Sequence, residues 1–352
     1  QMFKDKDYSF LSKILHHLAL GSNFIPEMLH DVEFAILKNK LKLDNLKPHI
    51  FICGLPRSGT TILMRSLYET KKFASLTYRD MPFVLLPNLW SKVSNKIKSG
   101  PEKERIHDDK ISINIDSPEA LEEVFWRVKL QKNYIYSNKL ITHTADEFTI
   151  NEFKNFVSLI LYKYKKELYL SKNNNNILRL ESIIKSFPNC IVIIPFRDPL
   201  QQANSLLFQH KNFTAVQNEN KFVKSYMSYL AHYEFGAIHR PYSFLRSNNE
   251  NIDKNSLEYW LMQWINAYTY LSQEKFFNYK NIIYLNYEEL CKKPEYIFKT
   301  LSKKININNL AFKEPNKLEI SKKKLETNES SMILNAKDIF IKLTQQSKIN
   351  FS

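Results

Sequence analysis

A glycine-bounded turn that follows a short apolar run is the part of the chain best suited to chemistry. Residues 50–62 read Ile-Phe-Ile-Cys-Gly-Leu-Pro-Arg-Ser-Gly-Thr-Thr-Ile, with Gly54 and Gly59 at the spacing of a phosphate-binding loop. In such a loop, backbone N–H groups and the N-terminus of the next helix hold an anion. ATP-binding loops have lysine where this chain has Thr60, and that lysine reaches the β and γ phosphates. The turn therefore predicts a phosphate site, but not an obvious ATP site.

Two later segments place a cation at the end of an expected strand. The apolar run Ile191–Phe196 is followed by Arg197-Asp198-Pro199, and Ser205 lies eight residues after the arginine. The run Tyr169–Lys172 ends in lysine. Arginine presents a planar fork that matches phosphate. The three segments in this order are a far stronger signal than the turn alone.

The string Pro-Arg-Ser-Gly-Thr-Thr at 56–61, with the two later segments, resembles the sulfotransferases that use 3′-phosphoadenosine 5′-phosphosulfate as donor. The bacterial group and the tyrosylprotein sulfotransferases are the most similar. The resemblance covers residues 48–210 by motif, with a weaker echo at 282–290. One departure is Asn174, which stands where the lysine loop of the family commonly has proline.

The resemblance implies a role for each matched residue. The 5′-phosphosulfate is expected to be held by Gly54, Arg57, Ser58, Gly59, Thr60 and Thr61. Arg197 and Ser205 are expected to bind the 3′-phosphate of the donor, and of the product adenosine 3′,5′-bisphosphate. Arg57 and Lys172 are expected to be catalytic, because they neutralise charge on the leaving oxygen. The transfer is expected to need no metal.

The general base that takes the acceptor proton is left open among three residues. In the tyrosylprotein enzymes a glutamate beyond the phosphate loop has this role, and the nearest carboxylate here is Asp80. Many cytosolic relatives use histidine, which makes His107 a rival. Glu119 is a third candidate, in a Ser-Pro-Glu segment that is typical of a helix start.

Composition indicates a globular enzyme. The 352 residues carry 51 basic and 36 acidic side chains, a formal net charge of +15, but no long basic block, so nucleic acid is not the expected partner. The three cysteines are expected to be buried reduced thiols. No apolar run is long enough to span a membrane, and no signal peptide opens the chain, so a cytoplasmic location is expected.

The pattern of apolar runs predicts an α/β fold with a P-loop-like, mostly parallel β-sheet, flanked by helices on both faces and interrupted by helical insertions. The expected strands are Ile50–Cys53, Leu168–Ser171, Ile191–Phe196 and Ile282–Leu285, and the expected helices include Phe10–Leu20, Glu27–Leu37, Glu152–Lys166 and Leu257–Leu271. A single domain is expected over 1–352, with a helical cap at 1–47 and a helical excursion on the acceptor side at 70–150. The asparagines at 173–176 are attributed to an AT-rich coding sequence.

The expected activity is transfer of a sulfonyl group to a hydroxyl or amine of a carbohydrate, glycolipid or small metabolite. Aromatic and basic residues crowd the segment Tyr226–Tyr242, which is an expected acceptor region. The alternatives are a P-loop kinase with a degenerate phosphate loop and a nucleotide-binding protein of the same fold without catalysis. The acceptor and the oligomeric state stay open.

Overall fold

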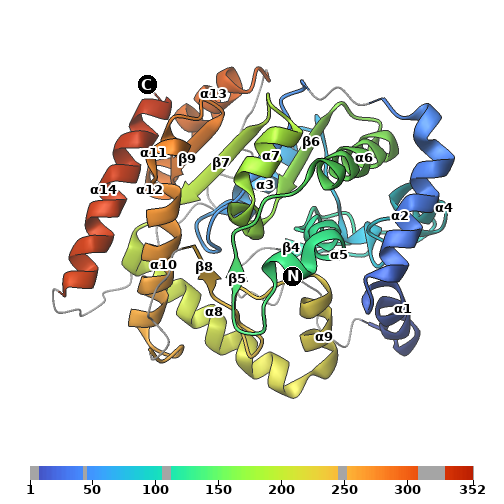
Figure 1. Cartoon of the computed structure of the whole chain (residues 1–352), viewed down its shortest axis with the longest axis horizontal. Helices are drawn as coiled ribbons and strands as arrows, with labels where there is room; N and C mark the ends of the chain where they lie inside the picture. The colour runs from blue at the N-terminus through green and yellow to red at the C-terminus, as the bar shows by residue number, and fades with distance from the viewer. Residues whose placement is uncertain (1–7, 43–45, 105–111, 245–251, 308–329, 352) are drawn as a thin grey trace.

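The computed structural model describes residues 8–42, 46–104, 112–244, 252–307 and 330–351. Its central sheet has five parallel strands in the order β2-β6-β1-β7-β9 (Figure 1). These strands are β1 (Ile50–Ile52), β2 (Phe73–Ala74), β6 (Leu168–Lys172), β7 (Ile191–Phe196) and β9 (Ile282–Asn286). The predicted α/β fold with a mostly parallel sheet is confirmed, and β2 is the strand of this sheet that the sequence did not predict.

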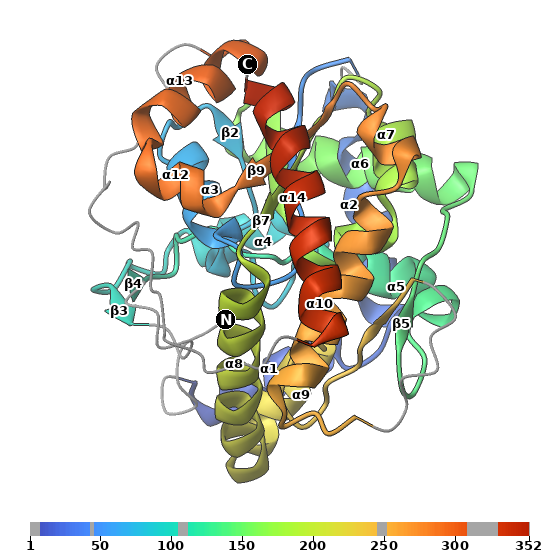
Figure 2. The same ribbon diagram turned by 90° about the vertical axis from the view of Figure 1, so that its left-hand side faces the viewer.

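Both faces of the sheet are buried, because each strand has apolar side chains on both sides. Phe51 points to one core, whereas Ile50 and Ile52 point to the other. One face is covered by α3 (Thr60–Tyr68), α12 (Tyr287–Lys292) and α13 (Pro294–Lys304), and the other by α6 (Glu147–Tyr164), α7 (Leu180–Ser186) and α10 (Leu257–Leu271). The helix α14 (Ser331–Phe351) packs on β9 and α10 (Figure 2).

The carboxyl ends of the parallel strands meet at one edge of the sheet, where loops commonly form binding sites. Beyond this edge lie α8 (Pro199–Glu219) and α9 (Lys221–Tyr229), with α8 starting directly after β7 (Figure 1).

The other helices are α1 (Phe10–Leu20), α2 (Phe24–Leu37), α4 (Pro87–Ser94), α5 (Glu123–Tyr134) and α11 (Glu274–Phe277). The 3₁₀ turns are η2 (Lys38–Lys40), η3 (Tyr78–Asp80) and η4 (Asn174–Leu178). The short strands are β3 (Lys103–Glu104), β4 (Ser112–Ile113), β5 (Leu140–Ile141) and β8 (Tyr242–Ser243).

One predicted helix start is wrong. The Ser-Pro-Glu segment at 117–119 does not begin a helix, and α5 begins at Glu123. Instead, the backbone N–H of Glu119 donates to Leu76 O at 3.1 Å, and the N–H of Tyr78 donates to Ser117 O at 3.3 Å. Pairing with a neighbouring segment therefore outweighed the local capping pattern.

Candidate active site

The turn between β1 and α3 has the backbone of an anion-binding loop. Gly54, Arg57 and Gly59 have φ angles of +147°, +70° and +92°. At Gly59 a Cβ atom would lie 2.6 Å from the ring of Tyr287, so only glycine fits without a shift of that ring. The Ser58 hydroxyl is buried and donates to Leu55 O at 2.8 Å, a hydrogen bond within the turn. The loop thus leads into the N-terminus of α3, where the first N–H groups have no partner within the helix.

The two phosphate motifs of the sequence meet in space. Arg57 Nε of the loop donates to Ser205 Oγ of α8 at 3.0 Å. Arg197, at the end of β7, lies over the ring of Tyr287 at 5.3 Å from its centroid. Its Nε atom is 4.0 Å from Glu288 Oε1. Because the same tyrosine ring lies next to Gly59, Arg197 is held close to the loop.

A pocket opens next to the loop. It is lined by Pro56, Arg57, Thr60, Thr61, Glu119, Lys172, Asn174, Met227, His232, Glu234 and Phe235, and encloses about 50 Å³. That volume is room for a few water molecules, so the enclosed part is the floor of a site rather than a space for a whole nucleotide. Lys172 is buried at the end of β6, in register with Ile52 of β1. The lysine therefore reaches the pocket from the strand beside the phosphate loop.

The segment after α9 brings a histidine and a carboxylate into the pocket. His232 Nδ1 lies 3.2 Å from Glu234 Oε1. An ionised carboxylate only accepts hydrogen bonds, so Nδ1 carries the proton, and Nε2 can accept a proton when the ring is uncharged. Burial raises the pKa of Glu234, but the charge of the protonated His232 ring and the hydrogen bond from it, with a smaller contribution from Lys172, outweigh burial and lower the pKa to about 2. Glu234 is therefore an anion at neutral pH.

The asparagine tract fixes the lysine turn onto this segment. Asn174 Nδ2 donates to Glu234 Oε1 at 3.2 Å, and Asn175 Nδ2 donates to Ala231 O at 3.2 Å. Asn173 Nδ2 donates to Glu123 Oε2 at 2.7 Å. All four asparagines at 173–176 are buried. Each of the four side-chain amides donates a hydrogen bond, so the tract has a structural role whatever the origin of its codons.

The three proposed bases lie in different places. Asp80 is fully buried, accepts hydrogen bonds from Tyr164 Oη (2.7 Å) and Thr77 N (2.8 Å), and forms an ion pair with Lys163, so it is not part of the pocket. Its bonds are those of a residue that fixes the turn η3 to α6. His107 lies outside the described residues. Glu119 does line the pocket and accepts a hydrogen bond of 2.6 Å from Tyr78 Oη.

Sequence reasoning missed His232 and Glu234 as individual residues, although both lie in the expected acceptor segment at 226–242. The spacing His-x-Glu has no meaning by itself, because either side chain could face solvent. What the sequence does contain is a pair of titratable side chains directly after a helix that ends at Tyr229. The tract of asparagines that holds them lies almost sixty residues earlier in the chain.

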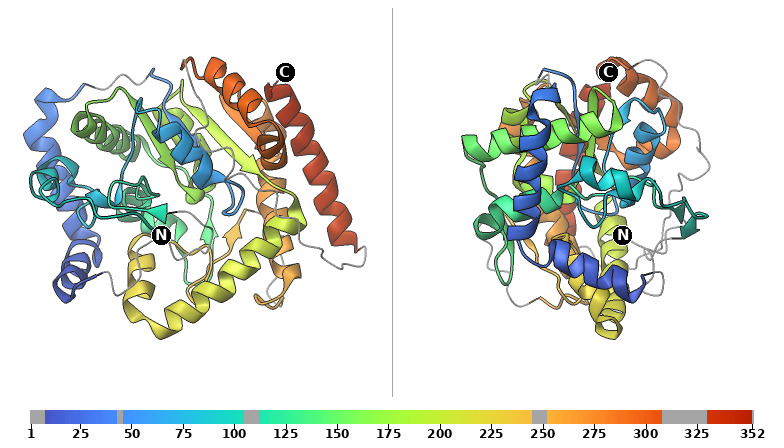
Figure 3. Two further views of the ribbon diagram at one scale, coloured as in Figure 1. Left: turned by 180° about the vertical axis from the view of Figure 1, so that it is seen from behind. Right: turned by 90° about the vertical axis from the view of Figure 1, so that its right-hand side faces the viewer.

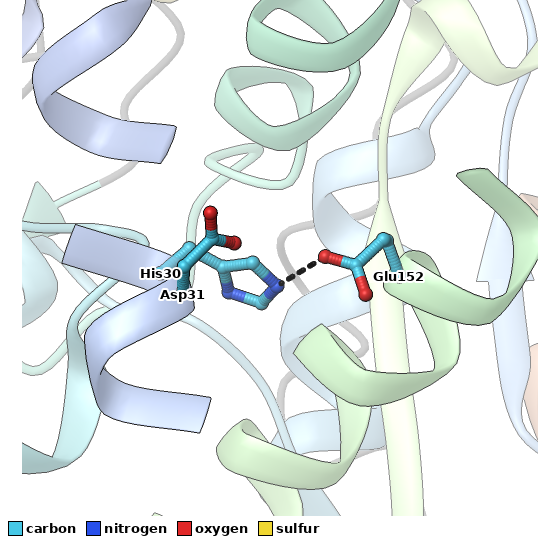
Figure 4. Close-up of side chains that lie close together, drawn as sticks. All are labelled: His30, Asp31 and Glu152. Atoms are coloured by element: carbon cyan, nitrogen blue, oxygen red, sulfur yellow. Dashed lines mark ion pairs between the residues drawn. The ribbon is translucent and has the colours of Figure 1, made fainter. Parts of the chain in front are cut away.

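A second cluster, far from the phosphate loop in sequence, has the residue types of a metal site. His30, Asp31 and Glu152 join α2 to α6 (Figure 4), and His30 Nε2 is 3.6 Å from Glu152 Oε2. Lys129 Nζ lies at the same distance from that oxygen. The proximity of His30 is the main cause that lowers the pKa of Glu152. The ammonium group of Lys129 would repel a metal ion bound at this cluster. The contact between His30 and Glu152 is therefore best described as an ion pair that joins α2 and α6.

Comparison with known proteins gives the family. The model of the sulfotransferase family matches residues 48–246, which is more than half of the chain. The chain therefore belongs to the sulfotransferase family. Among solved structures, it is similar to sulfotransferase STF1 from Mycobacterium tuberculosis (TM-score 0.47, 10% identity, 89% of this chain and 81% of that one). It is also similar to sulfotransferase STF9 from Mycobacterium avium (TM-score 0.45, 12% identity, 89% and 80% coverage). No curated protein matches the sequence.

Two of the earlier expectations concern cysteines and membranes. Cys53, Cys190 and Cys291 are free thiols, and the first two are buried. Burial raises the pKa of Cys53 and Cys190, which makes them poor nucleophiles. Within the described ranges, the helices are all too short or too polar to cross a lipid bilayer.

Proposed function

We propose that the protein transfers the sulfonyl group of 3′-phosphoadenosine 5′-phosphosulfate to a hydroxyl acceptor and releases adenosine 3′,5′-bisphosphate. The observation that carries the proposal is the pocket, where Arg57 and Thr60 of the phosphate loop meet Lys172 of the next strand and His232 of a distant segment. Two cations, a helix N-terminus and a proton acceptor in one place are what sulfonyl transfer requires.

The residues fit an anionic donor. The backbone N–H groups after Gly59 and the Thr61 hydroxyl would hold its 5′-phosphate at the N-terminus of α3. Arg197 and Ser205 would hold its 3′-phosphate; Arg197 is close to Glu288, so phosphate binding has to compete with that carboxylate. The donor supplies the sulfonyl group. Arg57 and Lys172 stabilise the negative charge that grows on the leaving oxygen.

His232 is our candidate for the general base. As the new bond between the acceptor oxygen and sulfur forms, the acceptor proton moves to Nε2 of the ring. Glu234 holds the ring in the required tautomer through Nδ1 and stabilises the imidazolium that results, so it is a positioning residue. Glu119 is the alternative base in the same pocket. Asp80 is not proposed again, because its buried ion pair leaves it no access to an acceptor.

A polar acceptor fits the rest of the lining. Asn174 lines the pocket, and within the described part of the chain its buried Oδ1 atom has no hydrogen-bond partner. A hydroxyl or amine of an acceptor would satisfy this oxygen, which is otherwise costly to bury. Met227 and Phe235 add apolar contact area. A carbohydrate, glycolipid or hydroxylated metabolite presents both kinds of surface.

The test is a transfer assay that follows release of adenosine 3′,5′-bisphosphate from the donor, with panels of sugars, glycolipids and small alcohols as acceptors. We expect acceptor-dependent release in the presence of EDTA, with the sulfated product identified by mass spectrometry. A matched reaction with ATP and Mg²⁺ distinguishes the kinase alternative, for which Thr60 stands at the lysine position. Phosphorylated product in that reaction, without sulfated product in the first, would contradict the proposal.

A further inference from the structure

The outer faces of the first two helices are unusually apolar. Of the nineteen exposed large hydrophobic residues in the described part of the chain, eight lie on α1 and α2, and each of these is 40–77% exposed. They are Phe10, Leu11, Ile14 and Leu18 on α1, and Phe24, Met28, Val32 and Ile36 on α2. We call these eight residues the apolar face. An exposed patch of this kind in a folded protein marks a contact surface.

The spacing on α2 makes the pattern specific. Its four exposed residues recur every fourth position, so they form one stripe along the helix. The opposite side of α2 is buried through Pro26, His30, Glu33 and Leu37. The helix therefore has one side that packs on the protein and another that is apolar but exposed. Figure 3 shows α1 and α2 together on the outside of one end of the molecule, with α14 at the other end.

A cationic hollow lies at the C-terminal end of α2. It has a volume of about 550 Å³, and its lining includes six lysines: Lys40, Lys42, Lys47, Lys163, Lys165 and Lys166. Lys47 pairs with Glu167, and Lys163 pairs with Asp80. Among the residues that the structure describes, the other four lysines of the hollow have no ion pair. The hollow is therefore positively charged, and its first lining residue, Lys40, lies four residues after Ile36, the last residue of the apolar stripe.

We propose that the apolar face and the lysine hollow together dock the protein on a bilayer that contains anionic lipids. Helices with an exposed apolar side can lie in the membrane interface, with that side at the boundary of the acyl chains. The charged residues of α2 are acidic, so attraction to anionic headgroups has to come from the lysines of the hollow. Lysines beside them are attracted to anionic headgroups. The lysine hollow argues for an anionic bilayer rather than a second copy, because a second copy would bring another cationic hollow to the same face.

Helix α1, which carries half of the apolar face, also contacts α9, the helix that leads into the candidate active site. Tyr229 of α9 and His17 Nδ1 of α1 are joined by a 2.7 Å hydrogen bond. Tyr8 and His16 pack against the ring of Tyr226 on the same helix. His232 lies three residues after the end of α9. A bilayer under α1 would thus lie near the acceptor side of the pocket, where it suits an amphiphilic acceptor; this last point alone rests on the proposed function.

The experiment is co-sedimentation of the full chain with vesicles, without donor or acceptor. We expect binding to vesicles of phosphatidylcholine with phosphatidylserine, and much weaker binding to phosphatidylcholine alone. The double variant Met28→Asp/Val32→Asp should weaken binding to the anionic vesicles by about tenfold or more. Lys40→Gln/Lys42→Gln should reduce the preference for anionic vesicles. The matched control is Leu334→Asp/Ile341→Asp on α14, two residues of similar exposure at the other end of the molecule, which should bind as the wild type does.

Melting curves of the variants establish that each is folded, and light scattering gives the oligomeric state. Failure of the wild type to bind either kind of vesicle would overturn the proposal. So would equal binding by the stripe variant and the α14 control. A wild-type dimer that the stripe variant converts to a monomer would assign the face to a second copy instead. None of these outcomes depends on sulfonyl transfer, so this proposal and the proposed function fail separately.

Discussion

Replacement of Glu234 by glutamine tests the electrostatics of the candidate site in depth. Glutamine keeps the shape of the side chain and an oxygen for the Asn174 amide, but removes the charge that faces His232. The pKa of Glu234 is about 2, against an ordinary value of 4.5. That difference corresponds to about 3 kcal/mol of stability at pH 7. The glutamate is buried, so solvent screening reduces this contribution little.

The lowered pKa of Glu234 also predicts how the stability difference between wild type and variant changes with pH. A carboxyl whose pKa is lowered by folding stabilises the native state above its unfolded pKa, and this stability is lost as the pH falls towards the folded pKa. The wild type should therefore exceed Glu234→Gln by about 3 kcal/mol at pH 7 and by only about 1.5 kcal/mol at pH 3. Urea unfolding at the two pH values, followed by tryptophan fluorescence, measures both differences.

Two results would contradict this prediction for Glu234→Gln. A loss of the same size at both pH values would mean that glutamine disturbs packing rather than charge. No loss at pH 7 would mean that His232 and Lys172 do not stabilise the anion. Glu119→Gln, at the other carboxylate of the pocket, is the matched control for the change in shape and hydrogen bonding that glutamine introduces.

Three further changes test other parts of the site. Lys172→Ala should lower turnover at saturating donor while leaving the affinity for adenosine 3′,5′-bisphosphate nearly unchanged, since its charge matters most in the transition state; equal loss of both would assign it to binding alone. Gly59→Ala should cost about 1–3 kcal/mol of unfolding free energy and weaken nucleotide binding, because the new methyl group meets Tyr287; a neutral effect in urea unfolding and titration calorimetry would contradict the loop geometry. Asp80→Asn should destabilise the fold by about 3–5 kcal/mol by leaving Lys163 unpaired, and a stable variant with a specific loss of turnover would restore Asp80 as the base.

The sequence predicted the elements that are set by local pattern. The strand at Ile191–Phe196 and the helices at Phe10–Leu20 and Leu257–Leu271 have the predicted bounds. Each has an apolar periodicity that neighbouring segments do not oppose. The two-residue strand at Phe73–Ala74 has too little pattern to be recognised, and it exists because it pairs with Leu168 and Tyr169 of β6.

The residues of the candidate site also divide into those that local sequence predicts and those that only tertiary structure brings together. Gly54, Gly59 and Arg57 could be placed from sequence because they lie within a few residues of one another on one turn. His232 and Lys172 share a pocket only because α9 ends beside the carboxyl edge of the sheet. This arrangement depends on tertiary structure and cannot be predicted from local sequence. Asp80 seemed a suitable base by its position in the chain. The sequence does not reveal that Lys163 and Tyr164, 83 and 84 residues later, bind its carboxylate.

The central claim is that the phosphate loop and the Arg197 segment bind one nucleotide with phosphates at both its 5′ and 3′ positions. Thermal unfolding with adenosine 3′,5′-bisphosphate, and with AMP and ATP as controls, tests it without knowledge of the acceptor. At a concentration one hundred times its dissociation constant, the bisphosphate should stabilise the chain by about 2.7 kcal/mol, and at the same concentration AMP and ATP should stabilise it far less. Arg197→Ala should abolish most of the difference between the bisphosphate and AMP. Equal stabilisation by AMP and the bisphosphate in the wild type would contradict the account.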